Sequence, residues 1–132
     1  MSRILVVDDN INLRKILRQI LESEGYQVRE ASNGVEAMSL LREAPDELVI
    51  TDVIMPDKEG IETVIEIRKV YPDVKIIVMS GGGRFGPDDY LETATVFGAN
   101  RTIPKPFSKN DILKAVQELL GQNAPNSAGV AS

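Results

Sequence analysis

The sequence of 132 residues has no cysteine, no histidine and no tryptophan, and only 5% of its residues are aromatic. Without cysteine the chain can form no disulfide and no thiolate metal site, which fits a reducing compartment, so we expect a cytoplasmic location. Without histidine it can have no Ser-His-Asp triad, no imidazole metal ligand and no phosphohistidine of its own. Polar chemistry in this chain must therefore come from carboxylates, hydroxyls, lysine and arginine.

Two further absences limit the partners. No apolar run is long enough to span a membrane, and the N-terminus lacks the charged-then-apolar pattern of a signal peptide. The net charge of −5 argues against a nucleic-acid surface, which needs clustered lysine and arginine. With 42% hydrophobic and 27% charged residues, the composition is that of a globular domain with its own core. We therefore expect neither a nucleic acid nor a membrane as partner.

Strand-like and helix-like segments alternate along the chain. Short β-branched runs predict five strands, at residues 3–8, 26–31, 47–53, 74–80 and 100–104. Helical spacing of apolar residues predicts a helix after each strand, at residues 11–25, 35–43, 61–70, 88–98 and 111–120. Five βα units predict a doubly wound α/β domain, with a parallel sheet covered on both faces. We expect residues 1–120 to form this domain and residues 121–132, low in apolar bulk, to form a flexible tail.

Acidic and polar residues follow the strands at one predicted edge of the sheet. Asp8 and Asp9 end the first strand, Asp52 the third and Ser80 the fourth, and Lys105 follows the fifth. In the doubly wound strand order 2-1-3-4-5, these side chains are expected to converge. Three carboxylates can ionise together only beside positive charge, and Mg²⁺ prefers carboxylate, water and phosphate oxygens. The set therefore predicts a magnesium site beside a carboxylate that can accept a phosphoryl group.

Each of these residues also has a plainer role when it is taken alone. Asp9 or Asn10 would cap the first helix, and Asp52 would be a loop acid. Ser80 would be a turn residue, and Lys105 a solvated surface lysine. The coincidence of five such residues at one edge favours a joint site.

The ordered motifs resemble those of the receiver domain of two-component response regulators. The resemblance covers about residues 3–120. It rests on VVDD at 6–9, Asp52 with Met55-Pro56 and Gly60, Ser80, Gly98-Ala99, and Lys105-Pro106-Phe107. It implies a flavodoxin-like (βα)5 sandwich with sheet order 2-1-3-4-5, and a phosphoprotein that acts in two-component or phosphorelay signal transduction.

The resemblance implies roles for the acidic residues. Asp52 would be the phosphoacceptor, and Mg²⁺ would be held by Asp9 and Asp52, by Asp8 through water, and by the backbone carbonyl of Ile54. The phosphoryl donor would be a histidine kinase or a histidine phosphotransfer protein. The absence of histidine fits this role, because the phosphohistidine then belongs to the partner.

The resemblance also implies a switch, with two departures from the family pattern. Lys105 would bind a phosphoryl oxygen and form a cis peptide with Pro106, and Ser80 would be the switch hydroxyl. Thr102, on the expected output surface, stands where the family often has Tyr or Phe. The glycine-rich loop at 81–87 is longer than the family pattern; it is either a flexible connector or a specialised lid or docking element. No Gly-Lys-Ser/Thr follows it, so it is not a nucleotide phosphate loop.

The first helix suggests a docking surface for the donor. Leu13, Ile16 and Ile20 lie on one flank of its apolar arc, where the family docks its kinase helices. The alternative is that all three are core residues.

Three classes of function are considered. The first is a phosphoacceptor switch that is not a turnover enzyme, whose output is a downstream protein target or an output domain on another or a longer chain. The second is a Mg²⁺-dependent phosphatase, which would place its nucleophile in an Asp-x-Asp pattern after the first strand; this chain has Asp8-Asp9 there instead. The third is a phosphorylation-independent scaffold, which an intact acidic pair, acceptor and lysine argue against.

Overall fold

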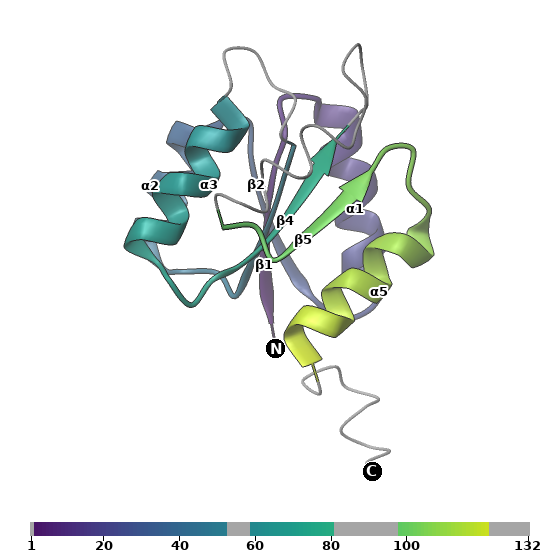
Figure 1. Ribbon diagram of the computed structural model, residues 1–132. Helices are drawn as coiled ribbons and strands as arrows, with labels where there is room; N and C mark the ends of the chain where they lie inside the picture. The colour runs from purple at the N-terminus through teal and green to yellow at the C-terminus, as the bar shows by residue number, and fades with distance from the viewer. Residues whose placement is uncertain (1, 53–58, 81–97, 122–132) are drawn as a thin grey trace.

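The computed structural model of the protein describes residues 2–52, 59–80 and 98–121 (Figure 1). Strands and helices alternate through most of this range, as the periodicity predicts. The strands are β1 (Arg3–Val7), β2 (Gln27–Ala31), β3 (Leu48–Asp52), β4 (Lys75–Ser80) and β5 (Arg101–Pro104). The helices are α1 (Ile11–Glu22), α2 (Gly34–Glu43), α3 (Glu59–Val70) and α5 (Lys109–Leu120).

The five strands form one parallel sheet in the order β2-β1-β3-β4-β5, which confirms the predicted fold class. Helix α3 begins at Glu59, two residues before the predicted start. The helix predicted at 88–98 and the glycine-rich loop at 81–87 lie outside the described residues, as does the tail from residue 122 onward.

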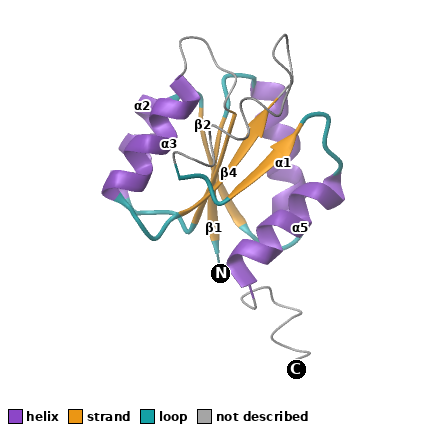
Figure 2. Ribbon diagram, viewed as in Figure 1, coloured by secondary structure: helices purple, strands orange, loops and turns teal. Residues whose placement is uncertain are grey.

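Helices cover the sheet on both sides. Figure 2 shows α1 and α5 on one face and α2 and α3 on the other. Successive side chains of a strand point to opposite faces, so Ile4 and Val6 of β1 join the core beneath α1 and α5, whereas Leu5 and Val7 join the core beneath α2 and α3. A central strand buried on both faces needs an unbroken apolar run, which explains the sequence at 4–7.

Side-chain caps determine where three of the helices begin. Asn10 caps α1, Asn33 caps α2, and Ser108 caps α5 in a capping box with Asp111. The plainer role considered for Asn10 is therefore confirmed. By ending the turn after β1 at a fixed residue, this cap also determines where Asp8 and Asp9 lie.

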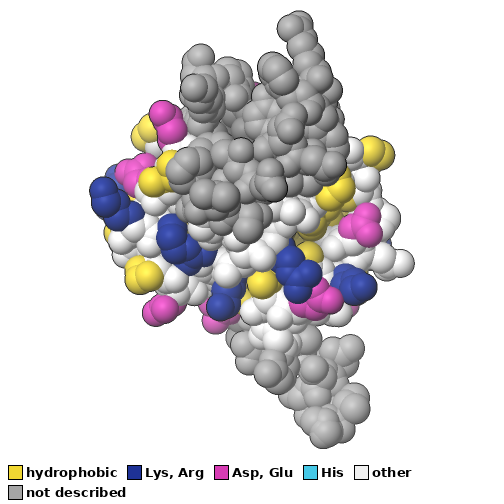
Figure 3. All heavy atoms as spheres, viewed as in Figure 1, with side chains coloured by type: hydrophobic (Ala, Val, Ile, Leu, Met, Phe, Trp, Pro, Cys, Tyr) yellow, Lys and Arg dark blue, Asp and Glu magenta, His cyan; other side chains and the backbone are white. Residues whose placement is uncertain are grey.

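The face seen in Figure 3 carries positive and negative side chains interspersed among the described residues. No helix of the described part is long and apolar enough to cross a membrane.

Arg68 fixes the start of β5. Its Nη1 donates hydrogen bonds to the carbonyls of Pro72 and Val74, at 2.6 and 2.8 Å. Its Nε and Nη2 donate to the carbonyl of Gly98, at 3.2 and 2.9 Å, and Nη2 also donates to Oδ1 of Asn100 at 2.7 Å. One guanidinium therefore ties the end of α3 and the start of β4 to the residues that lead into β5.

We predict that Gly98→Ala destabilises the fold more than Gly25→Ala does. Both glycines have positive φ angles, +121° and +92°, so an alanine at either position costs about 1–2 kcal/mol of backbone strain. A Cβ at Gly98 would also lie 3.1–3.3 Å from the side chain of Arg68, whereas a Cβ at Gly25 meets nothing within 4 Å. Urea unfolding of both variants tests this, and equal losses of unfolding free energy would contradict the role given to the Arg68 contact.

Candidate functional site

Two carboxylates and one ammonium group meet at the carboxyl edge of the sheet. Val7 of β1 pairs with Thr51 of β3, so Asp8 and Asp52 follow side by side on neighbouring strands. Lys105 follows β5, and its Nζ lies 3.0 Å from Oδ2 of Asp52 and 3.9 Å from Oδ2 of Asp8. The structure therefore brings together three of the residues predicted from the strand ends.

Both carboxylates are buried, with 1% of Asp8 and 6% of Asp52 exposed. Oδ1 of Asp8 accepts a 2.8 Å hydrogen bond from the backbone N–H of Asn10. Oδ2 of Asp8 has no hydrogen-bond donor among the described residues, because Lys105 Nζ at 3.9 Å is beyond hydrogen-bonding distance. A buried carboxylate oxygen without a donor is costly, so this atom fits a cation that binds oxygen ligands.

Burial raises the pKa of Asp8 to about 6, from an ordinary value of 3.8. The hydrogen bond from Asn10 opposes this shift, and the negative charge of Asp52 adds to it. Among the described residues, one lysine lies beside these two buried carboxylates, which leaves one negative charge in excess in that part of the site. Either a proton or a cation can supply the missing positive charge.

Asp9 is more exposed than the other two predicted carboxylates, Asp8 and Asp52. Its side chain is exposed, and the described residues hold no group of three acidic side chains arranged to bind a metal ion as they stand. Asp9 is nonetheless close enough to Asp8 to contribute to its raised pKa, so it borders the group formed by Asp8, Asp52 and Lys105.

The backbone places Ser80 at the same edge, because Ser80 pairs with Pro104, the residue before Lys105. The bond between Lys105 and Pro106 is cis, as the resemblance implies. Ile54 lies outside the described residues.

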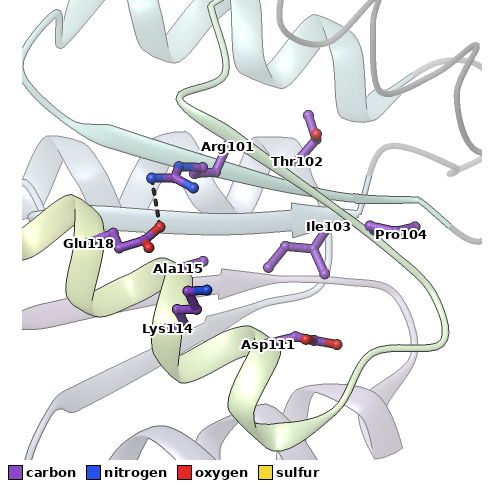
Figure 4. A pocket seen from close by; sticks show the side chains of 8 residues that line it. All are labelled: Arg101, Thr102, Ile103, Pro104, Asp111, Lys114, Ala115 and Glu118. Carbon is purple, nitrogen blue, oxygen red and sulfur yellow. Dashed lines mark ion pairs between the residues drawn. The ribbon is translucent and has the colours of Figure 1, made fainter.

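Thr102, predicted on the output surface, lies on β5 beside a shallow cavity of about 340 Å³ between β5 and α5 (Figure 4). Arg101 and Ile103 point toward α5, whereas Thr102 points to the opposite side of the strand. Arg101 pairs with Glu118 of α5 at 2.7 Å. The residues lining the cavity are Arg101, Thr102, Ile103, Pro104, Asp111, Lys114, Ala115 and Glu118.

The three residues predicted for donor docking differ in exposure. Leu13 and Ile20 are partly buried and pack against the core beneath α1 and α5. Ile16 is 51% exposed. The sequence left open whether these residues belong to the core or to a docking surface. Leu13 and Ile20 mainly pack against the core, whereas Ile16 is exposed enough to contact a partner.

Arg14 is a residue of the site that the sequence motifs do not identify. Its Nη1 donates a 2.6 Å hydrogen bond to the backbone carbonyl of Asp8. The available signal is that Arg14 and Arg18 lie one helical turn apart, opposite the acidic Glu30 of the second strand. That pattern predicts ion pairs, but it does not predict a contact with the backbone of Asp8.

The doubly wound sheet, with two buried carboxylates and a lysine at its carboxyl edge, has the fold and site that the motifs imply for a receiver domain. The family model described as the response regulator receiver domain matches residues 4–117. The chain therefore belongs to the response regulator receiver domain family, whose members act in two-component signalling with histidine kinases and output domains.

Known relatives differ in length. The chemotaxis protein CheY of Halobacterium salinarum is 36% identical over 119 residues, which cover 90% of this chain and 97% of that protein. The transcriptional regulatory protein CpxR homolog of Haemophilus influenzae is 36% identical over 132 residues, and this chain spans only 56% of its length.

Among solved structures, the CheY-like receiver domain protein from Methanospirillum hungatei is similar with a TM-score of 0.82. It is 31% identical, and the match covers 91% of this chain and 94% of that one. The similarity thus extends over nearly the whole of both chains.

We predict that the metal-free protein loses stability as the pH rises through about 6. Because the pKa of Asp8 is raised in the folded state, its contribution is fully present below about pH 4 and is lost above the folded pKa. The loss amounts to at most about 3 kcal/mol, since one pKa unit corresponds to about 1.4 kcal/mol. Urea unfolding in a chelator across this range measures the slope, which Asp8→Asn should abolish.

Asp9→Asn is the control for this prediction. It removes an exposed carboxylate that makes only the smallest contribution to the raised pKa of Asp8, so most of the slope should remain. Parallel profiles for the wild type and Asp8→Asn would contradict the assignment of the slope to Asp8.

Proposed function

We propose that this chain is a Mg²⁺-dependent phosphoacceptor, which receives a phosphoryl group on Asp52 from the phosphohistidine of a histidine kinase or histidine phosphotransfer protein. The observation that carries the proposal is the 3.0 Å contact between Lys105 Nζ and Asp52 Oδ2, beside the Asp8 oxygen that lacks a donor. Phosphoryl transfer depends on positioning and on neutralising charge, and this pocket offers both.

In the proposed reaction, a carboxylate oxygen of Asp52 attacks the phosphorus atom in line with the departing imidazole of the donor. The new O–P bond forms as the P–N bond of the phosphohistidine breaks. The ammonium of Lys105, already paired with Asp52, then contacts a phosphoryl oxygen and neutralises part of its charge. Water later attacks the acyl phosphate, which breaks the O–P bond, releases inorganic phosphate and restores the Asp52 carboxylate, so the chain accepts and loses the group without acting as a turnover enzyme.

The cation would be held by Asp8, Asp9 and Asp52 and by the backbone carbonyl of Ile54. When bound, Mg²⁺ supplies positive charge to the carboxylates and the incoming phosphoryl oxygens. The fit is supported by the Asp8 oxygen without a donor and by the all-oxygen set of side chains. Asp8, held by Asn10 and set deeper than Asp9, suits a contact through water.

The proposed switch runs from Ser80 to the surface around Thr102. Ser80 would move its hydroxyl toward the phosphoryl group, and the loop at 81–87 would follow. Thr102 is smaller than an aromatic side chain. The conformational change at β5 would therefore be a shift of the strand and its neighbouring residues, and not the rotation of a large aromatic ring. A downstream protein target, or an output domain on another or a longer chain, would read it.

The same proposal includes the organisation of the chain. Residues 1–120 would form the receiver domain and residues 121–132 a flexible tail. The donor would dock on α1 at Ile16, with Leu13 and Ile20 beside it, and the exchange would take place in the cytoplasm without nucleic acid or membrane as a partner.

We predict that the chain gains one phosphoryl group when it is incubated with acetyl phosphate and Mg²⁺, as measured by intact mass. Asp52→Asn should gain none, because it removes the nucleophile while keeping the shape of the side chain. Omitting Mg²⁺ should suppress the adduct. An adduct of equal yield on Asp52→Asn would rule out Asp52 as the acceptor, and a beryllofluoride complex of the wild type would distinguish a short-lived adduct from a scaffold.

We predict that Ile16→Lys slows phosphotransfer from the cognate donor by about ten-fold and leaves acetyl phosphate labelling unchanged. A lysine in the centre of an apolar contact must be desolvated on docking, at a cost of about 1–3 kcal/mol. Val35→Lys is the matched control, because Val35 is 75% exposed on α2, on the other face of the sheet. Equal losses with both phosphoryl donors would contradict docking at Ile16.

A further inference from the structure

The guanidinium of Arg14 connects three segments around the acidic turn at Asp8 and Asp9. Arg14 lies near the start of α1, and only 13% of its side chain is exposed. Its Nη1 donates to the Asp8 carbonyl at 2.6 Å, and its Nε donates to Oε1 of Glu30 on β2 at 3.0 Å. Arg14 thus joins α1 and β2 to the turn between β1 and α1.

The Asp8 carbonyl belongs to the peptide group that links Asp8 to Asp9. This group is planar, so the direction of the carbonyl fixes the direction in which the chain continues to the Cα of Asp9. A hydrogen bond from a charged donor is stronger than one from a neutral donor. By holding this carbonyl, Arg14 restrains the orientation of the next residue.

Other groups of Asp8 are held independently. Its N–H donates to the carbonyl of Ala31 at 3.1 Å, and its Oδ1 accepts from the N–H of Asn10 at 2.8 Å. With the carbonyl bound by Arg14, the polar atom of Asp8 left without a hydrogen bond in the described structure is Oδ2, on the side of Lys105. Hydrogen bonds from the protein itself therefore hold this turn in place.

Glu30 balances the charge of Arg14. The pKa of Glu30 is lowered despite its partial burial, because Arg18 and Arg14 both donate hydrogen bonds to its carboxylate. Glu30 is therefore ionised at neutral pH, and the ion pair places little net positive charge beside the acidic pocket.

We propose that Arg14 is a positioning residue of the cation site, which acts by fixing the Asp8–Asp9 peptide for ligation through Asp9. This inference rests on the proposed function, because it takes Asp9 to be a Mg²⁺ ligand. It also predicts the direction in which the affinity for Mg²⁺ changes when Arg14 is replaced. Removing a nearby positive charge would by itself strengthen Mg²⁺ binding, whereas loss of positioning weakens it.

The test is the Mg²⁺ dissociation constant of the full chain, measured by isothermal titration calorimetry at fixed ionic strength. Arg14→Met should bind Mg²⁺ about ten-fold more weakly than the wild type, the range found when a supporting contact to a ligand is lost. Arg18→Met is the matched control, because Arg18 pairs with the same Glu30 one helical turn further on and its other hydrogen bond goes to Glu22. It should stay within about two-fold of the wild type, as expected for a partly exposed ion pair.

Arg14→Lys separates charge from geometry and also covers the case in which the methionine variant does not fold. Lysine keeps the charge but lacks the planar fork that reaches Asp8 and Glu30 together, so we expect an intermediate loss of affinity. Unchanged or tighter binding by Arg14→Met, or an equal loss in Arg18→Met, would overturn the positioning role. If the wild type binds no Mg²⁺, or Asp9→Asn binds it equally well, the proposed cation site fails, and the positioning role fails with it.

Discussion

Among the described residues, the fold of this receiver domain places two buried carboxylates beside one ammonium group, with one negative charge in excess. Lys105 pairs closely with Asp52, and it lies too far from Asp8 to hydrogen-bond with it. Burial is the main cause of the raised pKa of Asp8, and the negative charge of Asp52 adds to it. The proposed Mg²⁺ dependence has the same origin, since a divalent ion would replace the proton and also attract a phosphoryl group.

The strand order creates this pocket, and contacts far from it keep its members in place. Because β1 and β3 are adjacent, Asp8 and Asp52 need no long side chain to meet. Lys105 comes from beyond β5, with β4 standing between β5 and β3, so it must reach across with a long, flexible stem. The start of β5 depends in turn on the hydrogen bonds of Arg68 to Gly98 and Asn100. The position of Lys105 thus depends on the hydrogen bonds that Arg68 makes at the opposite end of β5.

Much of this arrangement is predictable from the sequence, because strands, helices and strand ends leave periodic signals. The apolar run at 4–7 predicts a central strand, and the acids after it lie at the edge where parallel strands end. The strand-end rule does not predict that Asp9 is exposed whereas Asp8 is buried, because which of two adjacent acids faces inward depends on the turn into α1. Arg68 and Arg14 were not predicted, because hydrogen bonds from a side chain to a distant carbonyl have no characteristic spacing along the sequence.

Helix α1 carries both the proposed docking residue and the proposed positioning residue. Ile16 faces solvent, while Arg14, two residues earlier, points inward to the Asp8 carbonyl. A donor that docks on Ile16 would therefore contact the same helix that holds the acidic turn. Glu30 anchors this helix to β2 through Arg14 and Arg18. One anchored helix would thus present the donor surface and restrain the cation site, without any contact between the donor and Asp9.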